Sequence, residues 1–145
     1  MSKPAVSTDQ TLFVRDHCLC LAAQRAARSL SRRFDEAFRS LGLTSGQFSL
    51  LNALNRPQPP SVGSVAQLLA MDRTTLTANL KPLERGGLVR PEADPDDRRV
   101  RRLVLTEEGR DRLASAMPIW IAVHGEIDAG LIDAGVLRSG LAALR

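Results

Sequence analysis

Residues 64–87, SVAQLLAMDRTTLTANLKPLERGG, determine the fold that the sequence predicts. Ser64 and Gln67 have the spacing of a capping box, in which two side chains satisfy backbone amides at the start of a helix. Asp72 is a favourable N-cap for a second helix a few residues later, and Gly86 opens a glycine pair that ends it. The stretch therefore predicts two short helices joined by a tight turn at residue 71.

The second of these helices has one apolar face and one polar face. Leu76, Leu80 and Leu83 recur at helical spacing and are expected to be buried. Pro82 cannot donate a backbone hydrogen bond, so we expect a bend or a loosened last turn there. The positions that the leucines leave free point outward, and they carry Arg73, Thr74, Thr75, Thr77, Ala78 and Lys81.

Two short strands and a charged turn follow. Residues 88–92 and 100–105 are expected to pair, with Pro91 confining the first strand to the edge of the sheet. The turn between them, residues 93–99, is rich in Asp and Pro, which favour turns. At its end begins the densest basic stretch of the chain, which consists of Arg98, Arg99, Arg101 and Arg102. The order of short helix, turn, helix and ribbon is that of a winged helix-turn-helix.

Longer helical segments flank this unit. An apolar stripe on a 3.6-residue period predicts one helix over residues 9–41, and a helix of that length often packs against a second copy. Residues 1–8 are expected to be disordered. Further helices are expected to begin after the N-cap residues Thr44, Thr106 and Asp133, with Gln47 completing a capping box at the first.

The composition excludes several classes of protein. A chain of 145 residues with 43% hydrophobic residues can bury the core of one domain. Two cysteines cannot make a disulfide scaffold, and the longest apolar run, residues 116–123, is too short to span a membrane. The first residues lack the apolar stretch of a signal peptide, so a cytoplasmic protein is expected.

The charge is unevenly distributed. Lys and Arg total 20 and Asp and Glu total 16, a net charge of +4. The last 43 residues nevertheless hold 4 basic and 6 acidic side chains. A negatively charged partner would therefore meet the basic ribbon rather than the C-terminal helices.

This arrangement suits double-stranded DNA. The second helix of the turn fits the major groove, where hydroxyl and basic side chains reach phosphates and base edges. Arg98 and Arg99 at the ribbon tip can enter the narrow, negative minor groove. Asp97 beside them can hold one guanidinium in place through charge-assisted hydrogen bonds.

Catalytic chemistry is not indicated. The sequence has no Gly-rich phosphate loop, no Gly-x-Ser-x-Gly and no His-Glu-x-x-His motif, so neither an enzyme nor a cofactor is expected. His17, Cys18 and Cys20 form the only His/Cys cluster, and no second cluster completes the four ligands of a zinc site.

Over about residues 10–144 the chain resembles the MarR family of transcriptional regulators. No single motif is strong, but their joint order and spacing are specific. The motifs are Leu43-Thr44, Gln47-Phe48, residues 72–77, Leu83-Glu84, residues 87–89, residues 94–99, and Leu105-Thr106 with Gly109.

The resemblance implies a mainly α fold with a small β-wing, in one domain over residues 9–145. A winged helix-turn-helix at about 44–105 would be flanked by N- and C-terminal dimerisation helices at about 9–41 and 106–145. The protein would be a homodimer that binds a pseudo-palindromic operator and represses transcription. The recognition-helix role would fall on Arg73, Thr74, Thr75, Thr77 and Lys81, and the family's minor-groove Asp-x-Arg motif would be Asp97 and Arg99.

The same resemblance implies that the DNA complex responds to a small molecule. An anionic or phenolic effector would bind where the dimerisation helices meet the DNA-binding lobe, near Phe34 and Phe48. Such a ligand would shift the spacing of the two lobes by binding the two states unequally.

Two alternatives remain open. Cys20 lies 27 residues before Gln47, which matches the reactive cysteine of the family's organic-hydroperoxide-sensing branch, with Cys18 close by. Phe34 and Ser45 stand where that branch has tyrosines. The other alternative is a dimeric ligand-binding protein without DNA activity, and the basic ribbon argues against it.

Overall fold

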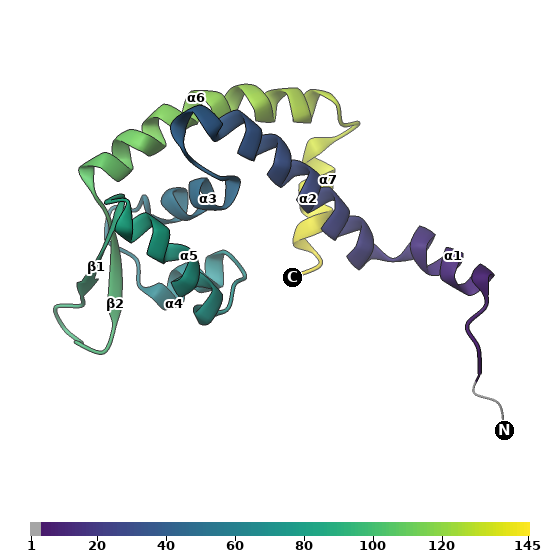
Figure 1. Ribbon diagram of the computed structural model, residues 1–145, viewed down its shortest axis with the longest axis horizontal. Coiled ribbons are helices and arrows are strands. Elements are labelled where there is room, and N and C mark those ends of the chain that lie inside the picture. Colours follow the sequence, from purple (N-terminus) through teal and green to yellow (C-terminus); the bar gives the residue numbers. More distant parts are fainter. Residues whose placement is uncertain (1–3) are drawn as a thin grey trace.

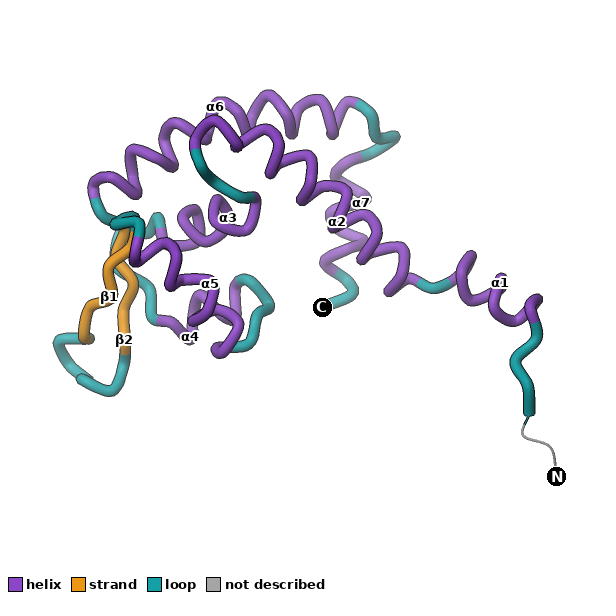
Figure 2. The backbone as a smooth tube through the Cα atoms, in the orientation of Figure 1, coloured by secondary structure: helices purple, strands orange, loops and turns teal. Residues whose placement is uncertain are grey.

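The computed structural model describes residues 4–145 as a mainly helical chain with one two-stranded ribbon (Figures 1 and 2). The elements are α1 (Thr8–His17), α2 (Leu19–Phe38), the 3₁₀ turn η1 (Arg39–Leu41), α3 (Ser45–Leu54), α4 (Val62–Leu68), α5 (Arg73–Arg85), β1 (Val89–Ala93), β2 (Arg101–Leu105), α6 (Glu107–Ala129) and α7 (Ala134–Ala142).

Helix α3 lies at the centre of the arrangement. It packs against α2 and α6 on one side and against α4, α5 and β2 on the other (Figure 1). The predicted helix-turn-helix and wing therefore form one lobe below α3, whereas α2 and α6 lie side by side above it. The fully buried side chains of this core are Phe38, Leu51, Val65, Leu76, Leu83 and Leu103.

The helix starts follow the local chemistry that the sequence predicts. At four predicted starts the N-cap oxygen accepts the amide three residues on, which satisfies a donor that the helix itself cannot pair. Thr44 and Gln47 form the predicted reciprocal capping box. The other confirmed N-caps are Asp72, Thr106 and Asp133.

The predicted helix over residues 9–41 is wrong as a single element. Cys18 has an extended backbone, φ −76° and ψ 108°, which separates α1 from α2. Its amide donates to the Val14 carbonyl as α1 ends, while its Sγ accepts the Leu21 amide as α2 begins. The break is stabilised by these local bonds, which apolar periodicity does not register.

The N-terminal boundary also differs from the prediction. Helix α1 begins at Thr8, within the stretch 1–8 expected to be disordered, and Ser7 caps it in a capping box with Gln10. Residues 1–3 of that stretch lie outside the described residues.

The predicted capping box at Ser64 and Gln67 is wrong. Helix α4 begins three residues earlier, and Ser61 is its N-cap. The Ser64 amide donates to Ser61 Oγ at 3.2 Å, and the Ser64 hydroxyl donates to the Ser61 carbonyl at 2.9 Å. Ser64 is thus the capped residue and not the cap.

The ribbon agrees with the prediction to within one residue at each strand start. β1 and β2 are antiparallel, with Pro91 opposite Leu103. On its other side β2 receives the loop before α4, because the Leu103 amide donates to the Pro60 carbonyl at 2.9 Å. β1 is therefore the edge strand, where a proline can be tolerated. Helix α5 continues through Pro82 to Arg85, so its last turn does not loosen as predicted.

The terminal helices leave their apolar side chains uncovered. Neither α1 nor α7 buries a residue, and α1 projects away from the rest of the chain (Figure 1). None of the described helices combines the length and apolar character needed to cross a bilayer.

Gly109 gives a test of how α6 is joined to the ribbon. A Cβ at this position would lie 2.1 Å from the Leu88 carbonyl oxygen, whereas a Cβ at Gly125 of the same helix would meet nothing within 4 Å. We expect Gly109→Ala to lower the free energy of unfolding by at least about 2 kcal/mol, because backbone must move. Gly125→Ala should raise it by roughly 0.5–1 kcal/mol through helix propensity. Denaturant unfolding measures both, and equal effects would contradict this packing.

Candidate DNA-binding interface

Helix α5 presents a polar face to solvent because its leucines are buried in the core. Thr74, Thr77 and Lys81 are exposed on this face. Thr75 is exposed too, but its amide and its hydroxyl both donate to the Asp72 carboxylate at 2.8 Å. These two bonds hold the pKa of Asp72 below its ordinary value. Thr75 therefore belongs to the helix cap as well as to the outward face.

Arg73 extends from the first turn of α5 across the start of α4. A Cβ on Gly63 would lie 2.7 Å from the Arg73 guanidinium, so a larger residue there would make the end of the Arg73 side chain shift. The side chain lines a hollow of about 370 Å³ between α5 and the ribbon, together with Thr77, Arg99 and Arg101. The structure thus brings a predicted helix residue and a predicted wing residue to the same groove.

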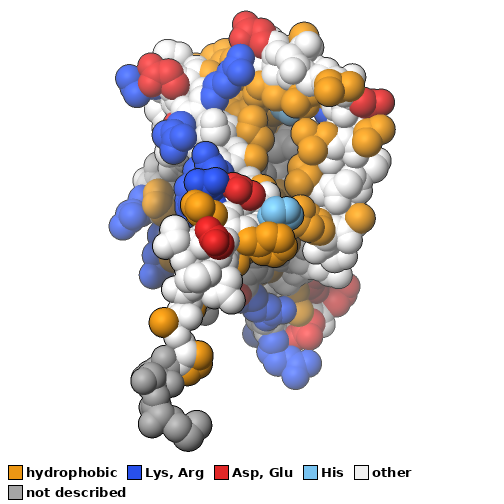
Figure 3. Space-filling view, turned by 90° about the vertical axis from the view of Figure 1, so that its right-hand side faces the viewer, with side chains coloured by type: hydrophobic (Ala, Val, Ile, Leu, Met, Phe, Trp, Pro, Cys, Tyr) orange, Lys and Arg blue, Asp and Glu red, His pale blue; other side chains and the backbone are white. Residues whose placement is uncertain are grey.

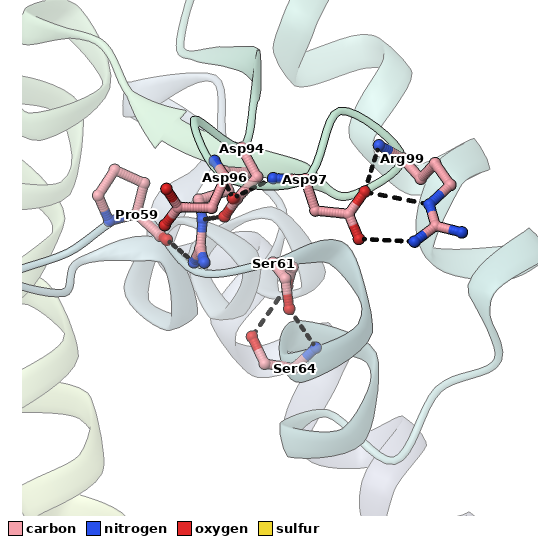
Figure 4. A network of polar contacts seen from close by, with 8 residues as sticks. Pro59, Ser61, Ser64, Asp94, Asp96, Asp97 and Arg99 are labelled. Carbon is pink, nitrogen blue, oxygen red and sulfur yellow. Dashed lines mark hydrogen bonds and ion pairs between the residues drawn. The ribbon is translucent and has the colours of Figure 1, made fainter.

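The wing tip holds Arg99 as the sequence predicts. Asp97 Oδ1 accepts both the Arg99 amide at 3.0 Å and Nε at 3.1 Å, and Oδ2 accepts Nη2 at 3.3 Å (Figure 4). The Arg99 side chain is nevertheless 91% exposed. Its bonds to the carboxylate hold the pKa of Asp97 below the ordinary value. Arg98, the other predicted tip cation, is exposed beside it.

Asp94 is a member of this site that the sequence reading missed. It is 7% exposed, and its Oδ1 accepts the amides of Asp96 at 2.8 Å and Asp97 at 3.0 Å. Its Oδ2 accepts Nε of Arg102, whose Nη1 donates to the Pro59 carbonyl at 2.8 Å. The Asp96 amide, followed by the Arg102 guanidinium, holds the pKa of Asp94 below its ordinary value. The sequence signal that could have found Asp94 is an aspartate at the start of a turn, followed directly by a proline, Pro95.

The basic stretch at residues 98–102 therefore has two roles. Arg102 turns back into the protein, while Arg98, Arg99 and Arg101 stay exposed. The four arginines look like one patch in the sequence. On β2, however, successive side chains point to opposite faces, so Arg101 and Arg102 are directed apart.

Comparisons with known proteins identify a family and find solved structures with the same winged helix-turn-helix fold. The MarR family model matches residues 41–100. The transcriptional activatory protein BadR of Rhodopseudomonas palustris is 32% identical over 134 residues, which are 88% of this chain and 77% of BadR. The chain belongs to the MarR family. It is a DNA-binding transcriptional regulator of that family.

Solved MarR-family structures superpose on most of the chain. MosR of M. tuberculosis, in complex with DNA, is 38% identical, with a TM-score of 0.82 over 88% of this chain and 93% of MosR. The repressor CouR bound to a 23-mer DNA duplex is 28% identical, with a TM-score of 0.73 over 90% and 92% of the two chains. CouR from Rhodococcus jostii RHA1 bound to p-coumaroyl-CoA is 25% identical, with a TM-score of 0.76 over 89% and 92%.

The predicted effector cleft of this MarR-family chain corresponds only in part to a hollow. A recess of about 450 Å³ opens between α3, α6 and the end of α4, and Phe48 lines it. Phe34 is not among its lining residues, because it stacks on Phe38 and on His124 instead. The rest of the lining is Ser49, Asn52, Ala53, Arg56, Leu68, Leu69, Met117 and Trp120.

The two cysteines lie at the break between α1 and α2. Cys18 is half-buried, with its sulfur engaged as the cap of α2, and Cys20 is exposed two residues further along the chain. His17 stacks on Phe13 and its Nδ1 lies 2.8 Å from the Phe13 carbonyl. Among residues 4–145 no group of three or more His, Cys, Asp or Glu side chains is placed to hold a metal ion.

Proposed function

We propose that this protein is a homodimeric repressor that binds a pseudo-palindromic operator and is released by a small anionic aromatic effector. The observation that carries the proposal is the groove shared by α5 and the ribbon. It combines an outward helix face bearing Arg73 and Thr77 with the exposed guanidinium of Arg99. A major-groove helix beside a minor-groove arginine is the arrangement by which winged helices read duplex DNA.

Roles divide between the two elements. On α5, Arg73, Thr74, Thr77 and Lys81 contact phosphates and base edges, with Thr75 supporting the first turn through Asp72. At the wing, Arg99 inserts into the minor groove while Arg98 contacts the flanking backbone. Asp97 fixes the guanidinium plane, so that Arg99 loses less rotational freedom on binding.

The apolar terminal helices support the dimer. Large hydrophobic side chains on α1 and α7 are exposed, among them Phe13 at 62%, Val136 at 68% and Leu144, just after α7, at 58%. Hydrophobic side chains gather along both sides of a central hollow on the face seen in Figure 3. Exposed apolar surface of this kind is favourable to bury against a partner. A second copy would place two recognition helices about one turn of DNA, ~34 Å, apart.

The hollow at Phe48 supports an aromatic anion as effector. Phe48 and Trp120 supply ring surfaces with centroids 6.4 Å apart, and Met117 and Leu69 extend the apolar wall. Arg56 supplies a cation at the rim, where its Nε donates to the Ala53 carbonyl at 3.3 Å. CouR, which binds p-coumaroyl-CoA, is a relative with a ligand of this chemistry.

Substitution of the wing arginine tests the DNA-binding role. The operator duplex is first recovered by selecting bound fragments from the source genome. We expect Arg99→Ala to weaken binding to it by about tenfold and to lower the slope of log K against log salt by about one unit, because one phosphate-adjacent cation is lost. The measurement is a fluorescence-anisotropy titration at several salt concentrations.

The matched control is Arg39→Ala. Arg39 is an exposed cation directly after α2, at the start of η1, and belongs to neither α5 nor the wing. Arg39→Ala removes the same charge but no proposed DNA contact, so the salt slope of this variant should equal that of the wild type. An unaltered slope for Arg99→Ala would refute the wing contact, and sedimentation of one chain per duplex rather than two would refute the dimer.

The single tryptophan of the chain reports on the effector hollow. We expect p-coumarate to change Trp120 fluorescence in a saturable way and to release the operator duplex, because the ring would lie against the indole. Arg56→Ala should weaken p-coumarate binding by roughly tenfold, the loss of one charged hydrogen bond of about 1.4 kcal/mol. The uncharged analogue p-cresol should lose nothing on that substitution. Equal losses for both ligands would remove Arg56 from anion recognition.

A second candidate function is release by thiol oxidation. The observation in its favour is that Cys20 is exposed directly after the break that Cys18 caps. Attack of the Cys20 thiolate on an organic hydroperoxide would form a sulfenic acid and release the alcohol. We expect cumene hydroperoxide to release DNA from the wild type and from Cys18→Ser but not from Cys20→Ser. Identical release by wild type and Cys20→Ser in gel-shift assays would exclude Cys20.

A further inference from the structure

We propose that Asp94 is a positioning residue for DNA recognition, because its carboxylate fixes the wing tip to the loop before α4 and thereby sets where Arg99 points. This inference rests on the proposed role of Arg99 at the wing. It concerns a residue that touches no DNA itself. Three donors converge on its two oxygens: the adjacent amides of Asp96 and Asp97 (Figure 4) and the guanidinium of Arg102 on β2.

The first step of the argument is the path from Asp94 to Arg99. The Asp97 amide is bound to Asp94 Oδ1 at 3.0 Å, and the Asp97 carboxylate holds the amide and guanidinium of Arg99. The Val100 amide closes the same turn on the Asp97 carbonyl at 3.0 Å. The backbone of residue 97 is thus held from one side by Asp94, while its side chain aims Arg99 on the other.

The second step is the connection to the helix-turn-helix. Arg102 links Asp94 to the Pro59 carbonyl, and the next residue of β2 donates its amide to the Pro60 carbonyl. Ser61, which follows, is the N-cap of α4 and pairs with Arg102 across an isolated bridge. Through Arg102, Asp94 therefore joins the wing tip to the start of the helix-turn-helix, and the Arg102–Pro59 bond in this link spans 43 residues of sequence.

The third step is electrostatic and separates this role from a general charge effect. Asp94 is a buried negative charge in the wing, which would face a polyanion, so removing it should by electrostatics alone strengthen DNA binding. A positioning role has the opposite sign, since losing the three hydrogen bonds would release the turn that aims Arg99. The direction of the change is therefore diagnostic.

The experiment is a double-variant cycle on the selected operator duplex. We expect Asp94→Ala to lower affinity by about tenfold and the salt slope by about one unit, close to the effect of Arg99→Ala. In the Arg99→Ala background, Asp94→Ala should cost no more than about twofold further, because the side chain it positions is already gone. Independent contributions would instead multiply to a loss of about a hundredfold.

Asp96→Ala is the matched control. Asp96 lies in the same turn, is exposed, and contributes only its amide to the network, so the variant removes an equal charge and no carboxylate hydrogen bond to the tip. Its affinity should stay unchanged or rise. If Asp94→Ala behaves like Asp96→Ala, or if it is fully additive with Arg99→Ala, the positioning role is wrong while the wing contact stands. If Arg99→Ala itself has no effect, the proposed wing contact fails first.

Folding is checked separately. Thermal unfolding by circular dichroism should show that Asp94→Ala retains the helical core, because the network lies in the ribbon. Asp94→Asn is the second variant, since its amide oxygen can still accept the two amides while the charged bond to Arg102 is lost. It should shift affinity in the same direction by a smaller factor. Hydrogen exchange of the Asp97 amide in the DNA-free protein should accelerate in Asp94→Ala, and unchanged exchange would overturn the proposal.

Discussion

The stacking of aromatic side chains around α3 is the contact on which the rest of the molecule depends. Phe38 of α2 is fully buried, with its ring 4.8 Å from that of Phe48 on α3, and Phe48 lies 6.4 Å from Trp120 of α6. These three rings join the two long helices to the helix that carries the DNA-binding lobe. Because aromatic side chains bury large apolar areas in fixed geometry, the lobe cannot rotate relative to α2 and α6 without separating them.

That constraint explains why a ligand at this junction could control DNA binding. The hollow proposed for the effector shares Phe48 and Trp120 with the stack, so a molecule bound there would press on the same rings that fix the lobe. A shift of one lobe changes the distance to the other in a dimer, and DNA tolerates only spacings near one helical turn. The ligand needs only to favour one of the two arrangements.

The sequence predicted the parts of the fold that short-range chemistry determines. N-caps at Thr44, Asp72 and Thr106 depend on one side chain and an amide three residues on, so they were visible before the structure. The same reasoning placed an N-cap at Ser64, although Ser61 caps α4, because the path of the preceding loop, which local spacing does not register, decides where the helix begins.

Tertiary contacts set the directions of side chains in the candidate site, and the sequence alone does not show these contacts. In the sequence Arg102 looked equivalent to its neighbours in a basic run. It turns inward because the Asp94 carboxylate and the Pro59 carbonyl accept hydrogen bonds from its guanidinium. The effector cleft was predicted near Phe34 and Phe48; Phe48 lines the recess beside α3, whereas Phe34 packs toward His124 of α6. Local patterns gave the elements and the outward residues, whereas the direction of individual side chains depended on partners far away in the sequence.

The wing combines a stiff backbone with a free cation, and this combination lowers the cost of binding. Asp94 ties down the turn, and Asp97 limits the rotamers of Arg99, while that guanidinium remains 91% exposed and available to a partner. Immobilising a long side chain costs about 0.5–1.5 kcal/mol on association, and part of that cost is met when the protein folds. In the proposed complex the carboxylates that supply this order would also repel DNA, so the wing would gain selectivity for sites where Arg99 fits and lose some affinity elsewhere. A regulator that must distinguish one operator from a genome of competing duplex needs that ratio more than it needs tight binding as such.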